Sequence, residues 1–180
     1  MEFKNVIKSR ESIRDYSDRK VEDEKINYVL ECARFAPSWT NKQCWKFIIV
    51  KDKKIINDLS KTSIINRWLK NVPIIIIACG NPKESGYRND ISYFIVDVSI
   101  ALEHLVLAAT DKGLGTCWIG GFNEKKVKKI LGIPDNIRVV ALTPLGYPAE
   151  KKHIIGKIAK IVTQSKKRKS MDEIIHINKW

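Results

Sequence analysis

The most constraining feature of this sequence is a long apolar stretch near its middle. Between Ile91 and Ala109, 14 of 19 residues are apolar. A membrane span needs about 20 such residues, but Asp97, Glu103 and His104 lie inside the stretch and each would be costly in lipid. A helix that is apolar nearly all round is instead buried at the centre of a protein. A chain of 180 residues has limited interior for such a helix. We therefore expect a second subunit to cover part of the helix, and hence a homodimer.

Helical and strand patterns alternate on either side of this stretch. Apolar residues at helical spacing predict further helices, over 3–7, 22–33, 53–70 and 123–131. Short apolar runs predict strands, over 45–50, 74–79, 116–119 and 138–145. The run at 74–79 is continuous, as is typical of a strand buried on both faces. No internal repeat or linker divides the chain, so we predict one layered domain over residues 1–180, of the α+β or α/β class.

The charge of the chain is strongly positive and unevenly spread. Its formal net charge is +13, and residues 151–180 contribute nine basic side chains against two acidic ones. Such a surplus attracts anions of many kinds, including nucleic acids, acidic lipids and phosphorylated ligands. The run from Lys166 to Lys169 is therefore open to two interpretations, a solvated basic tail or an anchor for a phosphate group.

The cysteines give no sign of a metal site. Cys32, Cys44, Cys79 and Cys117 are widely separated, no C-x-x-C pair occurs, and the three histidines do not cluster with them. The chain also opens with early charges and without the apolar run of a signal peptide. We expect free thiols, no bound metal and a location in the cytoplasm.

Two arginines flank a serine at the end of the first predicted helix. Arg10, Ser12 and Arg14 are spaced so that two forked guanidinium groups and a hydroxyl can converge on one phosphate. The alternative is a surface turn in which both arginines pair with acidic neighbours between residues 11 and 18. Spacing alone favours that alternative.

A loop dense in amides and hydroxyls follows at residues 36–45, between a helix and a buried strand. Asn41 and Gln43 can each donate to and accept from the edge of a heterocycle, and two tryptophans lie close by in the sequence. Ordinary turn chemistry is the alternative, with Ser38 and Asn41 bonded to the local backbone.

A glycine-rich segment occupies residues 113–121. It does not fit the dinucleotide-binding fingerprint, because Trp118 stands where the third glycine belongs and the segment precedes a strand instead of following one. Gly120 and Gly121 allow backbone N–H groups to approach a flat ligand closely. Taken alone, they are more simply a tight turn.

Catalysis by side chains finds little support. No G-x-S-x-G elbow and no pair of acids suited to hydrolysis stand out. Asp97, alone in an apolar stretch, is better explained as a satisfied polar group of the core or interface than as a general base. A chain that lacks chemistry of its own points to a cofactor, and we name no catalytic residue.

Taken together and in this order, these segments resemble those of the FMN-dependent nitroreductase family. The likeness spans almost the whole chain, through Ser9-Arg-Glu-Ser-Ile-Arg14, Ala36-Pro-Ser38 with Asn41, Gln43 and Trp45, and residues 113–120, 144–148 and 172–176. The resemblance implies an α+β homodimer, a three-layer sandwich whose central mixed β-sheet is flanked by helices, with two FMN molecules in the interface. It also implies that residues 149–180 form a basic C-terminal extension that reaches the partner subunit.

The resemblance implies three groups of cofactor-binding residues. The FMN phosphate is held by residues from both ends of the chain: Arg10, Ser12, Arg14, Lys166 and Arg168. The flavin ring meets a backbone turn near its reactive N5: Ile119, Gly120 and Gly121. The partner subunit contributes a loop to the ring: Pro37, Ser38, Asn41 and Gln43. Such a phosphate site agrees with the chemistry of the arginines, because a dianionic phosphate prefers several charge-assisted donors.

The activity that the resemblance implies is redox chemistry in a ping-pong cycle. NADH or NADPH passes a hydride to flavin N5 and leaves, and a nitroaromatic, a quinone or a similar electron-poor compound then takes the electrons. Three departures from the family pattern bear on detail. Cys44 stands where proline is usual and would loosen its loop, Trp39 replaces a small residue beside the flavin, and residues 153–164 resemble an insertion.

Rival functions stay open. A flavin-binding redox sensor or a dehalogenase-like relative would keep the fold and lose the reductase activity. A nucleic-acid-binding protein would explain the net charge of +13, but no RNA- or DNA-binding motif occurs and the aromatic residues are not interleaved with the basic ones. We therefore expect a small-molecule substrate, and neither a nucleic-acid partner nor a membrane.

Overall fold

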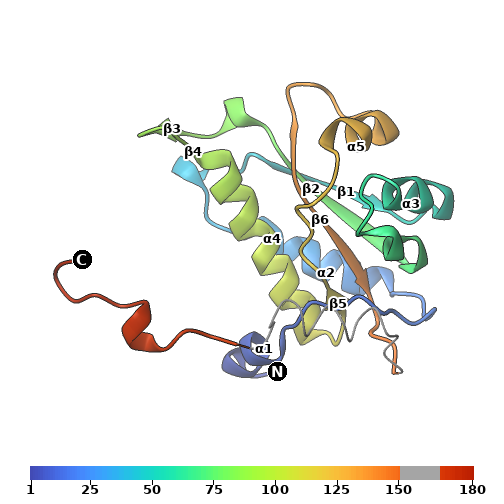
Figure 1. Cartoon of the computed structure of the whole chain (residues 1–180), viewed down its shortest axis with the longest axis horizontal. Coiled ribbons are helices and arrows are strands. Elements are labelled where there is room, and N and C mark those ends of the chain that lie inside the picture. The colour runs from blue at the N-terminus through green and yellow to red at the C-terminus, as the bar shows by residue number, and fades with distance from the viewer. Residues whose placement is uncertain (151–166) are drawn as a thin grey trace.

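The centre of the structure is a four-stranded sheet, seen in a computed structural model that describes residues 1–150 and 167–180. As Figure 1 shows, its strands lie in the order β1 (Trp45–Val50), β2 (Ile74–Gly80), β6 (Arg138–Gly146) and β5 (Gly115–Thr116). All three ladders between these strands are antiparallel. In the described part of the chain, parallel pairing enters only as the bridge between Ser12 and Thr116. The mixed sheet expected from the sequence is therefore antiparallel apart from this bridge.

The central strand β2 explains why the sheet has helices on both faces. All seven of its residues are buried, and successive side chains of a strand point to opposite faces. One set, which includes Ile76, packs in a core with α2 (Asp23–Arg34) and α4 (Tyr93–Asp111). The other set packs in a second core with α3 (Lys53–Ser60) and α5 (Glu124–Leu131) (Figure 1). The predicted three-layer α+β sandwich is confirmed.

Helix α4 is the central helix that the apolar stretch predicts. By length and composition alone it is the one helix among the described residues that could cross a membrane. It packs against α2 and the sheet, and its buried residues run from Phe94 to Ala109, so it is a core helix. Ile95 and Val96 are nevertheless 49% and 40% exposed. This open apolar side fits the expectation that a second subunit covers α4, which stays a prediction.

The helix predicted over residues 53–70 is wrong in its second half, because α3 ends at Ser60. At this end the hydroxyls of Ser60 and Thr62 each donate to a backbone carbonyl three residues earlier, both at 2.7 Å. They occupy acceptors that a further helical turn would use. The chain continues as a separate 3₁₀ helix, η2 (Arg67–Asn71).

Short elements complete the described part of the chain. They are α1 (Phe3–Ser9), the 3₁₀ helices η1 (Trp39–Asn41), η3 (Pro82–Glu84) and η4 (Met171–Glu173), and the strands β3 (Tyr87–Arg88) and β4 (Ile91–Ser92). β3 and β4 form a hairpin whose two turn residues, Asn89 and Asp90, have φ of 50° and 60°. Left-handed backbone at both positions is typical of a tight hairpin turn.

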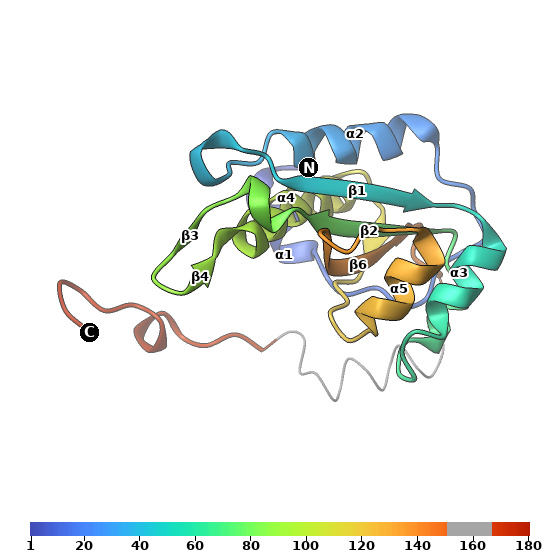
Figure 2. The ribbon, with the colours of Figure 1, turned by 90° about the horizontal axis from the view of Figure 1, so that it is seen from above.

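Residues 167–180 lie away from the sheet in both views of the molecule (Figures 1 and 2), and all of them are exposed. Large apolar side chains are among them: Ile174 is 58% exposed and Ile177 82% exposed. Exposed apolar side chains mark an interaction surface where they gather in a patch. The extension that reaches a second subunit stays a prediction.

Candidate functional site

The segment that carries the two arginines runs along the edge of the sheet. Arg10 is the residue that follows α1, and its N–H donates to Val6 O at 3.0 Å. Ser12 pairs with Thr116 of β5, where Ile13 N donates to Thr116 O at 2.8 Å. The approach is close, since a Cβ on Gly115 would lie 2.8 Å from the side chain of Ile13. Glycine at this position therefore lets the segment pair with β5.

Tyr16 holds the next turn of this segment in place. Its hydroxyl donates to Ile13 O at 2.8 Å, and its backbone bridges Pro148. Burial, with a smaller contribution from Cys117, raises the pKa of Tyr16 well above its ordinary value, so the phenol stays protonated and remains a donor. Ala149 N also donates to Asp15 O at 3.0 Å. The residues around Arg14 are therefore fixed beside the point where the chain enters its basic C-terminal part.

Both arginines lie near the buried thiol of Cys117. Burial raises the pKa of that thiol, while Arg14, a hydrogen bond with Ser12, and Arg10 act in the opposite direction. Neither guanidinium forms an ion pair with Asp15 or Asp18. The three residues predicted at the phosphate thus lie together beside Cys117.

Arg14 also borders a cavity of about 550 Å³. The cavity is also lined by neighbours of Arg14 and by residues of α3, of η2 and of the position after η2: Asp15, Tyr16, Asp18, Lys53, Trp68, Lys70, Asn71 and Val72. Lys53, Trp68 and Lys70 are absent from the predicted site because the sequence pattern places them on one long helix, over 53–70. The polar and aromatic composition of residues 66–71 is the signal that points to them.

The glycine turn lies at the far end of the same edge. Ile119 exchanges two backbone hydrogen bonds with Leu142 of β6, at 2.9 and 3.0 Å. The side-chain amide of Asn66 donates to Gly121 O at 2.8 Å, which ties the turn to the segment before η2. In the described part of the chain the N–H groups of Gly120 and Gly121 have no acceptor, and a Cβ on Gly120 would meet nothing. The outer side of the turn is therefore open.

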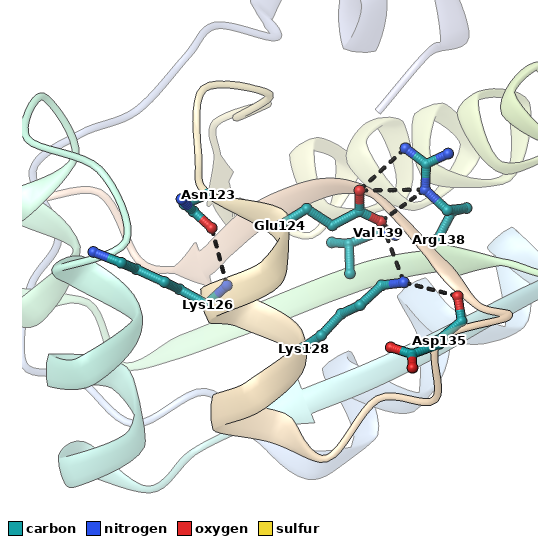
Figure 3. A network of polar contacts seen from close by, with 7 residues as sticks. All are labelled: Asn123, Glu124, Lys126, Lys128, Asp135, Arg138 and Val139. Atoms are coloured by element: carbon teal, nitrogen blue, oxygen red, sulfur yellow. Dashed lines mark hydrogen bonds and ion pairs between the residues drawn. The ribbon is translucent and has the colours of Figure 1, made fainter.

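A polar network fixes the helix that follows this turn (Figure 3). Asn123 caps α5 by accepting from Lys126 N at 3.0 Å. The Glu124 carboxylate accepts from Arg138 Nε at 2.9 Å and from Val139 N at 2.9 Å, at the start of β6. These hydrogen bonds hold the pKa of Glu124 below its ordinary value. The turn at Gly121 is thus anchored on both sides by rigid elements.

The loop at residues 37–43 has its own internal hydrogen bonds, as turn chemistry predicts. Gln43 N donates to Ser38 Oγ at 2.9 Å, and the Gln43 amide donates to Asn41 Oδ1 at 3.1 Å. Pro37, Asn41 and Gln43 are exposed. The backbone is also unusual, since Thr40, Asn41 and Gln43 have φ of 45°, 56° and 51°. The loop presents its amides outward in a conformation that most residues avoid.

This loop does not meet the arginine segment within one chain. Trp39 of the loop packs on Tyr93 in the first turn of α4, with ring centroids 4.5 Å apart. Ser12 instead pairs with Thr116, beyond the last residue of α4, and the two segments lie at different ends of that helix (Figure 1). A helix of 19 residues is roughly 28 Å long. The predicted site is therefore divided within a single chain.

Two predicted phosphate-binding residues, Lys166 and Arg168, and two departures from the family pattern lie outside the segments described above. Lys166 lies outside the described residues, as does the expected insertion at 153–164. Arg168 is exposed, and its guanidinium donates to Lys167 O at 2.8 Å. Cys44 is buried and its thiol lies 3.6 Å from Asp97 Oδ2, while the loosening expected from the loss of proline stays a prediction. Burial, followed by the nearby Asp97, raises the pKa of Cys44 to about 11.

Asp97 has the role that the sequence favours, a satisfied polar group of the core. It is 2% exposed, and its carboxylate accepts from Trp39 N at 2.9 Å and from Ser85 Oγ at 2.6 Å. All four cysteines are free thiols. No group of three potential metal ligands occurs among the described residues.

Known proteins resemble this chain in sequence and in fold. A model of the nitroreductase family matches residues 7–64 and 58–147. A protein of Archaeoglobus fulgidus, provisionally named NADH dehydrogenase/NAD(P)H nitroreductase, is 38% identical over 151 residues, which cover 82% of this chain and 86% of the relative. The crystal structure of a nitroreductase family protein from Clostridium novyi NT is 40% identical and has a TM-score of 0.81, over 100% of this chain and 95% of that one.

Two further relatives differ in their named activities. An FMN-dependent nitroreductase from Clostridium difficile R20291 is 29% identical with a TM-score of 0.78, over 97% of this chain and 98% of that one. Human iodotyrosine deiodinase 1 is 29% identical, over 97% of this chain and 68% of the relative. The family match covers the end of α1, the whole sheet and both candidate segments. The chain belongs to the nitroreductase family, a family of oxidoreductases.

Proposed function

We propose that this chain is an FMN-dependent oxidoreductase, which takes a hydride from NADH or NADPH and passes electrons to nitroaromatic, quinone or similar electron-poor compounds in a ping-pong cycle. The observation that carries the proposal is the gathering of Arg10, Ser12 and Arg14 around the thiol of Cys117, beside β5. FMN, when bound, supplies hydride acceptance and donation at N5. The protein residues supply binding and orientation.

The arginine segment has the donors that a phosphate group requires. Arg10 and Arg14 would give charge-assisted hydrogen bonds, which are the strong ones, and Ser12 a neutral hydrogen bond. The segment is already ordered by Ile13 N and by the Tyr16 hydroxyl, so little entropy is lost on binding. We propose that Lys166 and Arg168 complete this phosphate site from the C-terminal extension, residues 149–180.

The turn at Ile119, Gly120 and Gly121 would meet the ring of the cofactor. Its two glycine N–H groups have no acceptor in the described part of the chain, and a polar atom at the edge of a flavin could accept from them. The hydrogen bond from Asn66 to Gly121 O holds the turn from behind. A turn fixed in this way orients the ring without side-chain chemistry, so no residue is required as acid or base.

The loop with Pro37, Ser38, Asn41 and Gln43 would serve the FMN of a partner subunit. It lies at the other end of α4 from Ser12 in its own chain. The open apolar side of α4 at Ile95 and Val96 supports a homodimer that contacts through this helix. Four free thiols support a reducing compartment, the cytoplasm.

The absorbance spectrum of the purified protein tests this function. We expect a yellow protein that releases FMN on denaturation. Anaerobic NADH or NADPH should bleach the flavin, and a nitroaromatic or a quinone should restore its colour. A colourless protein that takes up no FMN and binds DNA with a steep salt dependence would contradict the proposal in favour of nucleic-acid binding.

A second candidate function is reductive dehalogenation, favoured by the likeness to iodotyrosine deiodinase 1. It differs in the compound that reoxidises the flavin. Release of iodide from an iodotyrosine, with no turnover of nitroaromatics or quinones, would support it. A flavin that no such compound reoxidises would instead indicate a redox sensor.

A further inference from the structure

Asp97 is a carboxylate buried among neutral donors. It is 2% exposed, and its two oxygens accept from Trp39 N, from Ser85 Oγ and, at 3.6 Å, from Cys44 Sγ. No lysine or arginine of the described residues forms an ion pair with it. Burying a carboxylate without a cation is costly, and the neutral donors around Asp97 offset that cost only while they stay in place.

The donors to Asp97 come from three separate parts of the chain. Trp39 belongs to the loop at residues 37–43, and Cys44 is the residue before β1. Ser85 lies in the segment between η3 and β3. One carboxylate on α4 thus determines where all three lie. The backbone N–H of Trp39 at 2.9 Å is the contact that fixes the loop itself.

Ser85 also links Asp97 to the side chain of Trp39. Its neighbour Gly86 lies against the indole, since a Cβ on Gly86 would be 2.2 Å from a ring atom. The indole also packs on Tyr93, the first residue of α4. The carboxylate of Asp97 therefore positions both the backbone of Trp39 and the segment that packs on its ring.

The loop requires such an anchor because its backbone is strained. Thr40, Asn41 and Gln43 all have left-handed φ angles, which residues other than glycine adopt only when the surroundings impose them. Strain of this kind collects at binding sites. Without the contact at Trp39 N, the loop would relax, and Asn41 and Gln43 would turn away from their present directions.

We infer that Asp97 is a positioning residue, which holds the 37–43 loop in the conformation that binds the FMN of the partner subunit. The inference rests on the proposed function. It adds that Asp97, buried in one subunit, controls a cofactor site at which the other subunit binds the FMN phosphate.

The first test compares D97N and S85A with S60A. Asn keeps one acceptor oxygen and turns an N–H₂ group toward donors, and S85A removes one donor. Ser60 is a similarly buried polar residue, 2% exposed, but it belongs to α3 and its hydroxyl donates to Asn57 O. We expect D97N to raise the Kd for FMN at least tenfold and S85A to raise it severalfold, with less than a twofold change in S60A. FMN affinity in D97N equal to that of S60A would overturn the inference.

The second test uses mixed dimers, because it distinguishes positioning from general destabilisation. One chain carries R10A/R14A and lacks the phosphate site, and the other carries D97N and lacks a well-placed loop. Each homodimer should bind FMN poorly. The co-expressed, doubly tagged heterodimer should bind one FMN, since one of its sites combines the intact arginines of one chain with the intact loop of the other.

The outcomes separate the two hypotheses. A heterodimer without FMN, made from a wild type that binds FMN, would overturn the inference and leave the proposed function standing. A wild-type dimer that binds no FMN would instead contradict the proposed function itself.

Discussion

Replacement of Arg10 and Arg14 by alanine tests the phosphate site directly. Hydrogen bonds to charged groups contribute roughly 1.5–3 kcal/mol each. Loss of both arginines should therefore cost about 3–6 kcal/mol of binding free energy, which is a roughly 10²- to 10⁴-fold rise in the Kd for FMN. Folding should change little, because the segment is held by hydrogen bonds of the Tyr16 hydroxyl and of Ile13 N, which involve neither arginine side chain.

Titration of the apoprotein with FMN and with riboflavin measures the effect, since the two ligands share a ring and differ by the phosphate. R10A/R14A should lose the preference for FMN and keep its affinity for riboflavin. The matched control is R19A/R34A, which removes the same charge from exposed arginines paired with Glu22 and Glu31. Unchanged FMN binding in R10A/R14A, or an equal loss in the control, would refute the reasoning.

Two changes of tyrosine test the framework around the site. Y16F removes the donor to Ile13 O and should lower the free energy of unfolding by about 1 kcal/mol; an unchanged urea midpoint would contradict this. Glu22 has a pKa of about 2 instead of 4.5, chiefly because the Tyr147 hydroxyl donates to it at 2.6 Å. Stability from this group is complete above pH 4.5 and is lost as the pH falls toward 2. Y147F should flatten that part of the pH profile of the urea midpoint, and an unaltered profile would show that the hydroxyl does not hold the pKa down.

The sheet and its layers were predictable because they depend on strong local patterns. The run at Ile74–Gly80 is apolar at almost every position, and such a run is buried on both faces whatever surrounds it. The end of α3 was not predictable, because apolar spacing continues past Ser60. The helix ends there because two hydroxyls hydrogen-bond to carbonyls of its last turn. The geometry of these hydrogen bonds exists only in the folded chain.

The residue types of the candidate site were predictable from the sequence, but the contacts between its segments were not. The spacing of Arg10, Ser12 and Arg14 allowed a phosphate site, but taken alone it favoured pairing with acidic neighbours. Only the bridge to Thr116 shows that the segment is held against β5. The contact of Cys44 with Asp97, 53 residues away in the sequence, was not predictable for the same reason. Contacts over such separations leave no trace in local patterns.

The division of the site between the ends of α4 leads to a last prediction, that FMN binding requires the dimer. The arginine segment lies beyond the C-terminal end of α4 and the 37–43 loop at its N-terminal end, so one chain offers only half of the proposed contacts. Ile95, 49% exposed on the open side of α4, is a place to break the dimer without disturbing the core. I95E would bury an unpaired charge in each subunit at a cost of at least about 2 kcal/mol. We expect a folded monomer by light scattering and circular dichroism, with FMN affinity reduced at least tenfold. A folded monomer that keeps full affinity for FMN would place the whole site within one chain.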